Sequence, residues 1–321
     1  MLVHLMRRLG QSLLVLLAVS FLSFLVFRHL GDPTVSLLGE DASLAERQRL
    51  VAELGFDQPV PVQFARYLDN VLHGRFGISY RVRRPVTEVI AERAPATLEL
   101  AAVAALVALL GGIVLGVRGA LRRDGWTGRL LAAASLVGVS LPTFLIGIGL
   151  IYLFAVRLHW LPSFGRGEVV MLGGWSTGLL TASGWLSLIL PVATLALFKL
   201  TLIQRLVRAE MLEAMRSDYV RFARARGLGE RRIVYGHALR NTLIPVITIA
   251  GLQVGSLVAF AIVTETVFQW PGLGALFIAS IQAVDVPVIA AYLLLIALLY
   301  VVINLVVDLV YALADPRLRR A

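Results

Sequence analysis

The chain has 321 residues, of which 58% are hydrophobic and 16% are charged, and its formal charge is +10. This composition is too apolar for an ordinary soluble domain and predicts several membrane spans. The absence of cysteine excludes disulfides, thiolate catalysis and iron–sulfur clusters. Lys199 is the one lysine, in the context FKL, so the chain has no GxxxxGK[ST] phosphate loop. If ATP drives this protein, another chain must bind it.

Six apolar runs are long enough to cross a hydrocarbon core, for which about 20 residues suffice. They lie near 9–28, 97–117, 130–156, 185–204, 243–267 and 287–313. Pro142 in the third run and Pro191 in the fourth predict kinks or local gaps in the backbone hydrogen bonding. We expect an all-α integral membrane protein with three parts: an N-terminal span at 1–30, an extracytoplasmic helical segment at 31–95, and a five-helix core at 96–321 with a cytoplasmic loop at 205–242.

Arginines indicate the orientation, because short loops rich in arginine stay in the cytoplasm. With the N-terminus inside, 18 arginines are cytoplasmic, nine of them between 205 and 240, and 11 are outside. The segment 31–95 is nearly neutral, with nine carboxylates against eight arginines, and is a weak signal. The short loops therefore predict that both termini are cytoplasmic.

The segment 31–95 is typical of small helices. Ser43 and Glu46 form a capping-box pattern for one helix that Gly55 can close, and further helices are predicted over 61–73 and 86–93. Together they would form a cap over the extracytoplasmic mouth where a substrate-delivering protein docks. A simple structured loop is the alternative.

The basic segment 210–245 lies between two apolar runs and contains a short helix with its own start and stop. Ser217 is a candidate N-cap, Asp218 lies in the first turn, and Gly227 can adopt the left-handed conformation that ends a helix. The spacing predicts one face that carries Tyr219, Phe222, Ala223 and Arg226, flanked by Arg221 and Arg224. Such a face can dock on a protein or rest on anionic headgroups.

Charged residues inside spans usually mark an ion path. We expect Glu99, Lys199, Glu265 and Asp308 to lie near span ends, and the sequence has no evident inverted repeat. A proton- or sodium-coupled carrier would be expected to hold a charged group in the middle of a span. Both features therefore favour a transport energy source outside this chain. The GxSxG pattern at 174–178 is interpreted as a Gly-rich loop, and the five histidines show no metal-ligand spacing, so no catalytic residue and no metal site are predicted.

The segment ETVFQWPGLG at 265–274 contains helix breakers and aromatic rings. Pro271, Gly272 and Gly274 are expected to break the helix outside the fifth run. Phe268 and Trp270 suit either a pocket wall or an aromatic belt at the membrane interface.

The basic segment resembles the cytoplasmic EAA loop of ABC importer permeases, with Arg221-Phe222-Ala223 in place of Glu-Ala-Ala. Only Ala223, Gly227 and Leu239 match the general pattern, whereas DYVRFARARGL followed by HALRNTLIP is similar to the form in the dipeptide, oligopeptide and nickel permease family. The resemblance to that family extends to FDQPVPVQFARYL, GRFGISY, ETVFQWPGLG and NLVVDLVYALADPRLR, which occur in the family's order along almost the whole chain.

The resemblance implies a permease subunit with the type I ABC importer fold and six transmembrane helices, in a bacterial or archaeal plasma membrane. It would form half of a pathway for di- or oligopeptides delivered by a substrate-binding protein. A second homologous permease subunit, two ATP-binding subunits that hold ATP and magnesium, and membrane lipid are the implied partners; nucleic acid is not. Nickel, another metal chelate or glutathione is the alternative cargo, and an uncoupled channel or scaffold is the rival class.

The resemblance also assigns two groups of residues. The coupling group, which would contact an ATPase subunit, comprises Asp218, Tyr219, Arg221, Phe222, Ala223, Arg224, Arg226, Gly227 and Leu239. The gate group, beside the translocation pathway on the extracytoplasmic side, comprises Phe268, Trp270, Pro271, Gly272 and Gly274.

Single introduced cysteines test the orientation without background, because the chain has none of its own. Positions within 45–90 and 160–180 should react with an impermeant reagent from outside, and positions within 119–128 and 215–232 only from inside. Labelling of Gly119→Cys from outside and of Ser43→Cys from inside would show that the predicted orientation is wrong.

Overall fold

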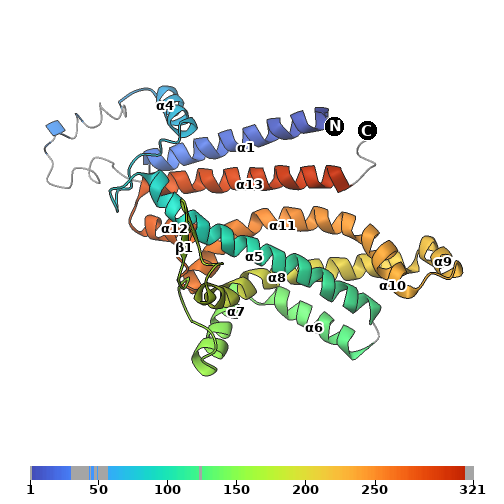
Figure 1. Ribbon diagram of the computed structural model, residues 1–321. Helices are drawn as coiled ribbons and strands as arrows, with labels where there is room; N and C mark the ends of the chain where they lie inside the picture. The colour runs from blue at the N-terminus through green and yellow to red at the C-terminus, as the bar shows by residue number, and fades with distance from the viewer. Residues whose placement is uncertain are drawn as a thin grey trace. The chain divides into compact units, whose positions relative to one another are not determined.

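The computed structural model describes residues 2–29, 43, 45–46, 49, 57–122 and 125–314. Helices dominate the described residues, with one two-stranded antiparallel hairpin (Figure 1). The elements are α1 (Leu2–His29), α4 (Val60–Leu72), α5 (Val86–Leu121), α6 (Trp126–Ser140), α7 (Thr143–Leu150), the π-helix η1 (Ile151–Arg157), β1 (Val170–Leu172), β2 (Trp175–Thr177), α8 (Ala182–Arg216), α9 (Asp218–Ala225), α10 (Glu230–Arg232), the π-helix η2 (Ile233–Ala238), α11 (Leu239–Val267), α12 (Leu273–Gln282) and α13 (Val286–Ala314).

The chain divides into two compact units. Unit 1 contains residues 96–271 and 302–321, and unit 2 contains residues 2–95 and 272–301. In unit 1, α8 contacts α6, α7 and α11. A Cβ added to Gly112 would lie 2.7 Å from Ile203, and one added to Gly116 would lie 2.6 Å from Val207. These two glycines, spaced GxxxG, therefore allow α5 to approach α8 closely.

Unit 2 is held by aromatic packing and by one buried carboxylate. Phe24 of α1 packs on Tyr67 of α4, with ring centroids 5.8 Å apart, and the Tyr67 hydroxyl donates to Ser23 at 2.9 Å. Asp285 accepts hydrogen bonds from the Ser79 hydroxyl and, at 3.0 Å, from the Tyr80 amide. Burial and the nearby Asp285 charge raise the pKa of the Tyr80 hydroxyl to about 12. These bonds fix the loop between α4 and α5.

Several sequence expectations for the helices are confirmed. α4 falls within two residues of the predicted 61–73 helix, and Gly74 after it has φ +69°. The helix is interrupted between α6 and α7, where Pro142 is expected to interrupt the third apolar run. Ser43 and Glu46 form the reciprocal capping-box bonds, at 2.9 and 3.3 Å. Most of the helix expected after Ser43, and Gly55, lie outside the described residues.

One expectation about the helix bounds is wrong. The helix predicted over 86–93 and the second apolar run form one continuous helix, α5, through Pro95. α8 also continues through Pro191, so the kink or gap expected there does not end the helix. A proline removes one hydrogen bond and crowds the preceding turn, and packing of the surrounding helix can offset that cost.

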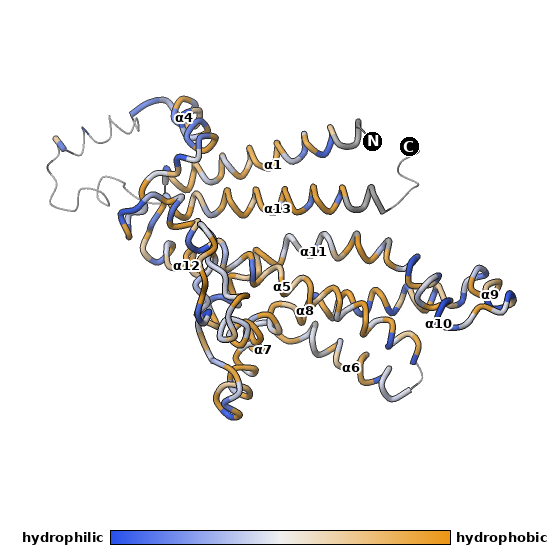
Figure 2. Tube along the Cα trace, viewed as in Figure 1, coloured by the Kyte–Doolittle hydropathy of each residue, from blue (hydrophilic) through white to orange (hydrophobic). Residues whose placement is uncertain are grey.

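Four helices among the described residues are long and apolar enough to cross a membrane: Met6–Arg28, Val86–Leu121, Ala182–Arg216 and Val286–Leu309. A fifth candidate is the pair Glu230–Leu243 and Pro245–Gly251, which is bent by 45°. In unit 1, apolar residues run along α5, α8 and α11, whereas hydrophilic residues gather on α9 and α10 (Figure 2). Such lengths and this pattern are those of a multi-pass membrane protein.

Gly116→Val tests the contact between α5 and α8. The added side chain would meet Val207 and the carbonyl oxygen of Gln204, at 2.6 and 2.9 Å. We expect this overpacking to destabilise the protein by about 1–3 kcal/mol, measured by thermal unfolding in detergent. Gly149→Ala is the control, because an added Cβ meets nothing within 4 Å there. Equal melting temperatures for the two variants would contradict close packing at Gly116.

Candidate functional site: the α9 surface

Two backbone hydrogen bonds close the C-terminal end of α9. The Leu228 amide donates to the Ala223 carbonyl at 3.2 Å, the Gly227 amide donates to the Arg224 carbonyl at 2.9 Å, and Gly227 has φ +75°. This is a Schellman motif, which the left-handed glycine makes possible. At the other end, Ser217 occupies the N-cap position as predicted, but its hydroxyl donates back to the Ala214 carbonyl and does not cap the helix.

The two faces of α9 have different surroundings. Val220 and Ala223, 0% and 7% exposed, belong to the apolar core of unit 1. Tyr219 and Phe222 point away from that core and are 39% and 64% exposed. Arg226 is also exposed. Grouping Ala223 with the exposed face is therefore wrong, because α9 needs a small side chain where it approaches its own core.

Charged residues of the coupling group are paired on the surface. Arg221 pairs with Asp218, and Arg224 pairs with Glu230 at 2.6 Å. The Glu230 carboxylate raises the pKa of the Arg224 guanidinium. Arg226 lies 5.8 Å from the centroid of the Phe222 ring, within cation–π range. Exposed ion pairs of this kind contribute little to folding stability. They mainly determine the shape and the charge of the surface.

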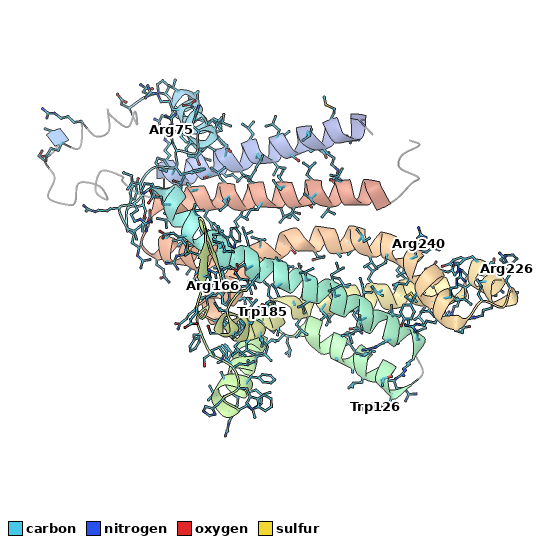
Figure 3. The ribbon with its side chains drawn as sticks, viewed as in Figure 1. Arg75, Trp126, Arg166, Trp185, Arg226 and Arg240 are labelled. Carbon is cyan, nitrogen blue, oxygen red and sulfur yellow. The ribbon has the colours of Figure 1, made fainter. Side chains whose placement is uncertain are left out.

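Leu239, the last member of the coupling group, lies apart from the exposed surface. It begins α11 and packs, partly buried, against the core of unit 1. We use the name α9 surface for the exposed residues Tyr219, Phe222 and Arg226. In unit 1 this surface and Arg240 lie at one end, and Arg166 and Trp185 lie at the other (Figure 3).

Four of the five residues of the gate group are buried. Phe268 and Trp270 are each 1% exposed, so the description of these rings as an aromatic belt is wrong. The helix ends at Val267, before the predicted breakers, because Gln269 adopts φ +47° and the Trp270 amide bonds the Glu265 carbonyl at 2.8 Å. The Trp270 indole donates to the Ala96 carbonyl at 3.0 Å.

The three remaining gate residues follow that turn. Pro271 is half-buried at the end of unit 1, whereas Gly272 and Gly274 are buried in unit 2, where α12 begins. The structure thus brings Phe268 and Trp270 together around the end of α11 and gives them packing contacts.

Sequence reasoning missed a buried ion pair between Glu99 of α5 and Arg166. Arg166 and Glu99 are 8% and 6% exposed, and their side chains meet at 2.7 Å. Glu99 also accepts from the Trp175 indole at 3.1 Å, and Arg166 donates to the Ser176 carbonyl at 2.7 Å. The pair ties the hairpin to α5. A lone glutamate at the start of an apolar run was the one available signal.

The same contacts explain the GxSxG pattern. Ser176 lies in β2 of the hairpin, which is a more regular structure than the expected loop, and its hydroxyl accepts from Arg166 at 3.0 Å. Among the described residues, no group of three histidine, aspartate or glutamate side chains is arranged to hold a metal ion.

The fold is that of an ABC importer permease: a chain of the MetNI methionine ABC transporter in an inward-facing conformation matches with a TM-score of 0.54 and 18% identity, covering 68% of this chain and 93% of that chain. Residues 1–101 match the N-terminal model of binding-protein-dependent transport system membrane components, and residues 108–320 match the model of the inner membrane component. The chain belongs to this family of transport components, which are not enzymes.

Two relatives match over nearly their full length. A putative peptide transport system permease protein of Brucella abortus is 40% identical, with 98% of each chain covered. A probable D,D-dipeptide transport system permease protein of Escherichia coli is 42% identical, with 98% of this chain and 96% of the relative covered. The family assigns the chain to the inner membrane and implies ATPase and binding-protein partners.

Glu99→Gln tests the buried ion pair. The substitution leaves the Arg166 charge buried without its counter-ion, and we expect a loss of about 3–5 kcal/mol in unfolding free energy. The double variant Glu99→Gln/Arg166→Met removes both charges and should recover part of that loss. Denaturant unfolding, with limited proteolysis of residues 158–181, measures both. Additive losses in the double variant would show that the two side chains do not interact.

Proposed function

We propose that this chain is the permease subunit of a type I ABC importer that carries di- or oligopeptides. It would form half of the translocation pathway with a second homologous permease subunit, and two ATP-binding subunits would hold ATP and magnesium. Six transmembrane helices result if α6, α7 and η1 are counted as one broken span in addition to the five candidates. Both termini would be cytoplasmic.

The α9 surface is the observation that carries this proposal. α9 has a defined end at Gly227, is fixed to its own subunit through Val220 and Ala223, and exposes two aromatic rings and a guanidinium. Aromatic residues and arginine are enriched at protein interfaces. A rigid helix with such a surface suits transmission of movement from an ATPase.

Peptide cargo is favoured by the relatives, which are described as peptide and D,D-dipeptide permeases. Nickel, another metal chelate or glutathione is the alternative cargo for the same machinery. An uncoupled channel or scaffold is the rival class, and it would purify as a homo-oligomer without ATPase subunits.

Phe222→Asp tests the coupling role. Phe222 is 64% exposed, so the change should leave the fold of the subunit intact while it places a charge in the proposed contact. We expect loss of copurifying ATPase subunits, or ATP hydrolysis without transport. Met171→Asp is the matched control, since Met171 is 62% exposed and lies in the hairpin. Transport at the wild-type rate by the Phe222 variant, with the ATPases attached, would reassign the α9 surface to lipid contact.

Gly227→Val is a second, independent test. A branched side chain at φ +75° should cost about 1 kcal/mol or more and tilt the end of α9. We expect the same loss of coupling with normal membrane insertion. Ala223→Glu is a poor substitute, because it would place a carboxylate in the core of the subunit itself.

A further inference from the structure

Lys199 is a buried cation that no carboxylate of the described part of the chain neutralises. It lies at the midpoint of the 35-residue helix α8, which is longer than a bilayer crossing needs, and it is 6% exposed. Its ammonium donates to the Gln253 side chain of α11 at 2.5 Å. Among the described residues, no carboxylate forms a salt bridge with it. A charged group within a membrane span is costly, and such groups usually serve a function.

The ammonium lines a cavity of about 350 Å³ in unit 1. The rings of Phe198 and Phe260 lie beside the ammonium, with centroids 5.4 and 5.5 Å from it. A cavity of this size lies within the range of roughly 300–1,000 Å³ that holds small ligands. Lys199 also lines a second cavity, of about 470 Å³, where Gln253 is the other polar lining residue. Polar ligand groups are therefore better accommodated in the first cavity.

The break between α6 and α7 forms part of the wall of the first cavity. Ser140, Pro142 and Thr143 line it there, and α7 starts at Thr143 without a side-chain cap. The start of a helix carries partial positive charge and attracts anions. Discontinuous helices contribute to anion sites in membrane transporters through this effect. The cavity thus combines a buried ammonium, a helix start and two hydroxyl-bearing residues with aromatic rings.

We propose that this cavity is a subsite for the C-terminal carboxylate of a peptide in transit. The inference rests on the proposed function, in which the chain carries peptides. The carboxylate would pair with Lys199, and the apolar lining would contact the last side chain of the peptide. An amide partner such as Gln253 holds the ammonium in place without neutralising it, so the charge stays available for a ligand that binds and leaves.

Uptake by the complete importer in proteoliposomes, with its binding protein, tests the subsite. The probes are trialanine and trialanine amide, which differ at the carboxylate alone. We expect Lys199→Gln to lower trialanine uptake about tenfold or more while amide uptake changes less than about twofold. Lys199→Arg should keep most trialanine uptake. The same binding protein serves every variant, so its own preference cancels when each variant is compared with wild type.

Gln253→Glu separates the subsite from a folding defect. It keeps Lys199 but supplies an internal carboxylate at the position of the present amide, and it should reduce trialanine uptake as Lys199→Gln does. Thr201→Val is the matched control, because Thr201 is buried in α8 and its hydroxyl bonds to the backbone of its own helix. This control should affect both probes equally.

Chemical modification of Lys199 gives a direct readout of binding. Trialanine should protect Lys199 from a membrane-permeant acetylating reagent, as followed by mass spectrometry of this chain, and trialanine amide should not. Equal protection by both probes, or an unchanged ratio of acid to amide uptake in Lys199→Gln and Gln253→Glu, would overturn the subsite and leave the lysine a purely structural role. Failure of the wild-type importer to take up either probe would count instead against the proposed function.

Discussion

The burial of Val220 and Ala223 against the core of unit 1 is the constraint on which the account of coupling depends. A helix of eight residues has little stability of its own in water, because forming its first turn costs more than a single hydrogen bond returns. The buried valine contributes about 1.5–3 kcal/mol and fixes the orientation of α9 relative to α8 and η2, which it contacts. If an ATPase pushes on the exposed side of α9, these contacts would pass the force on to the membrane helices.

α8 connects three features of unit 1 that are far apart along its length. Its start is capped by Thr181, whose hydroxyl accepts from the Gly184 amide at 3.0 Å, close in sequence to the hairpin that Arg166 and Glu99 hold on α5. Lys199 lies at its midpoint, and α9 follows its last residue after Ser217. A change in the tilt of one continuous helix would therefore reach the hairpin, the Lys199 cavity and the α9 surface together.

Local signals in the sequence were sufficient for the features that depend on local chemistry. Gly227 ends α9, Gly74 follows α4, and the run that contains Pro142 breaks there, because backbone conformation and missing amide donors act over one turn. Features set by packing were not predictable in this way. Pro95 and Pro191 lie within continuous helices, whereas Pro142 lies at a break, although the residue type is the same.

The candidate site shows the same division between local and tertiary effects. Helical spacing grouped Ala223 with Tyr219 and Phe222, but which edge of that stripe is buried depends on contacts with α8 and η2. The partner of Glu99 lies 67 residues away in sequence, at a distance where periodicity carries no information. Six spans, cytoplasmic termini, the gate role of Phe268 and Trp270, and the division into parts at 1–30, 31–95 and 96–321 stay predictions.

Site-specific photo-crosslinking tests most directly whether α9 transmits movement from an ATPase. A photoreactive amino acid would replace Phe222 on the exposed side of α9, or Met171 in the hairpin, in the complete importer. We expect crosslinks to an ATPase subunit from position 222, with a yield that changes on addition of ATP, and none from position 171. Crosslinks from position 222 to lipid alone, with or without nucleotide, would contradict it.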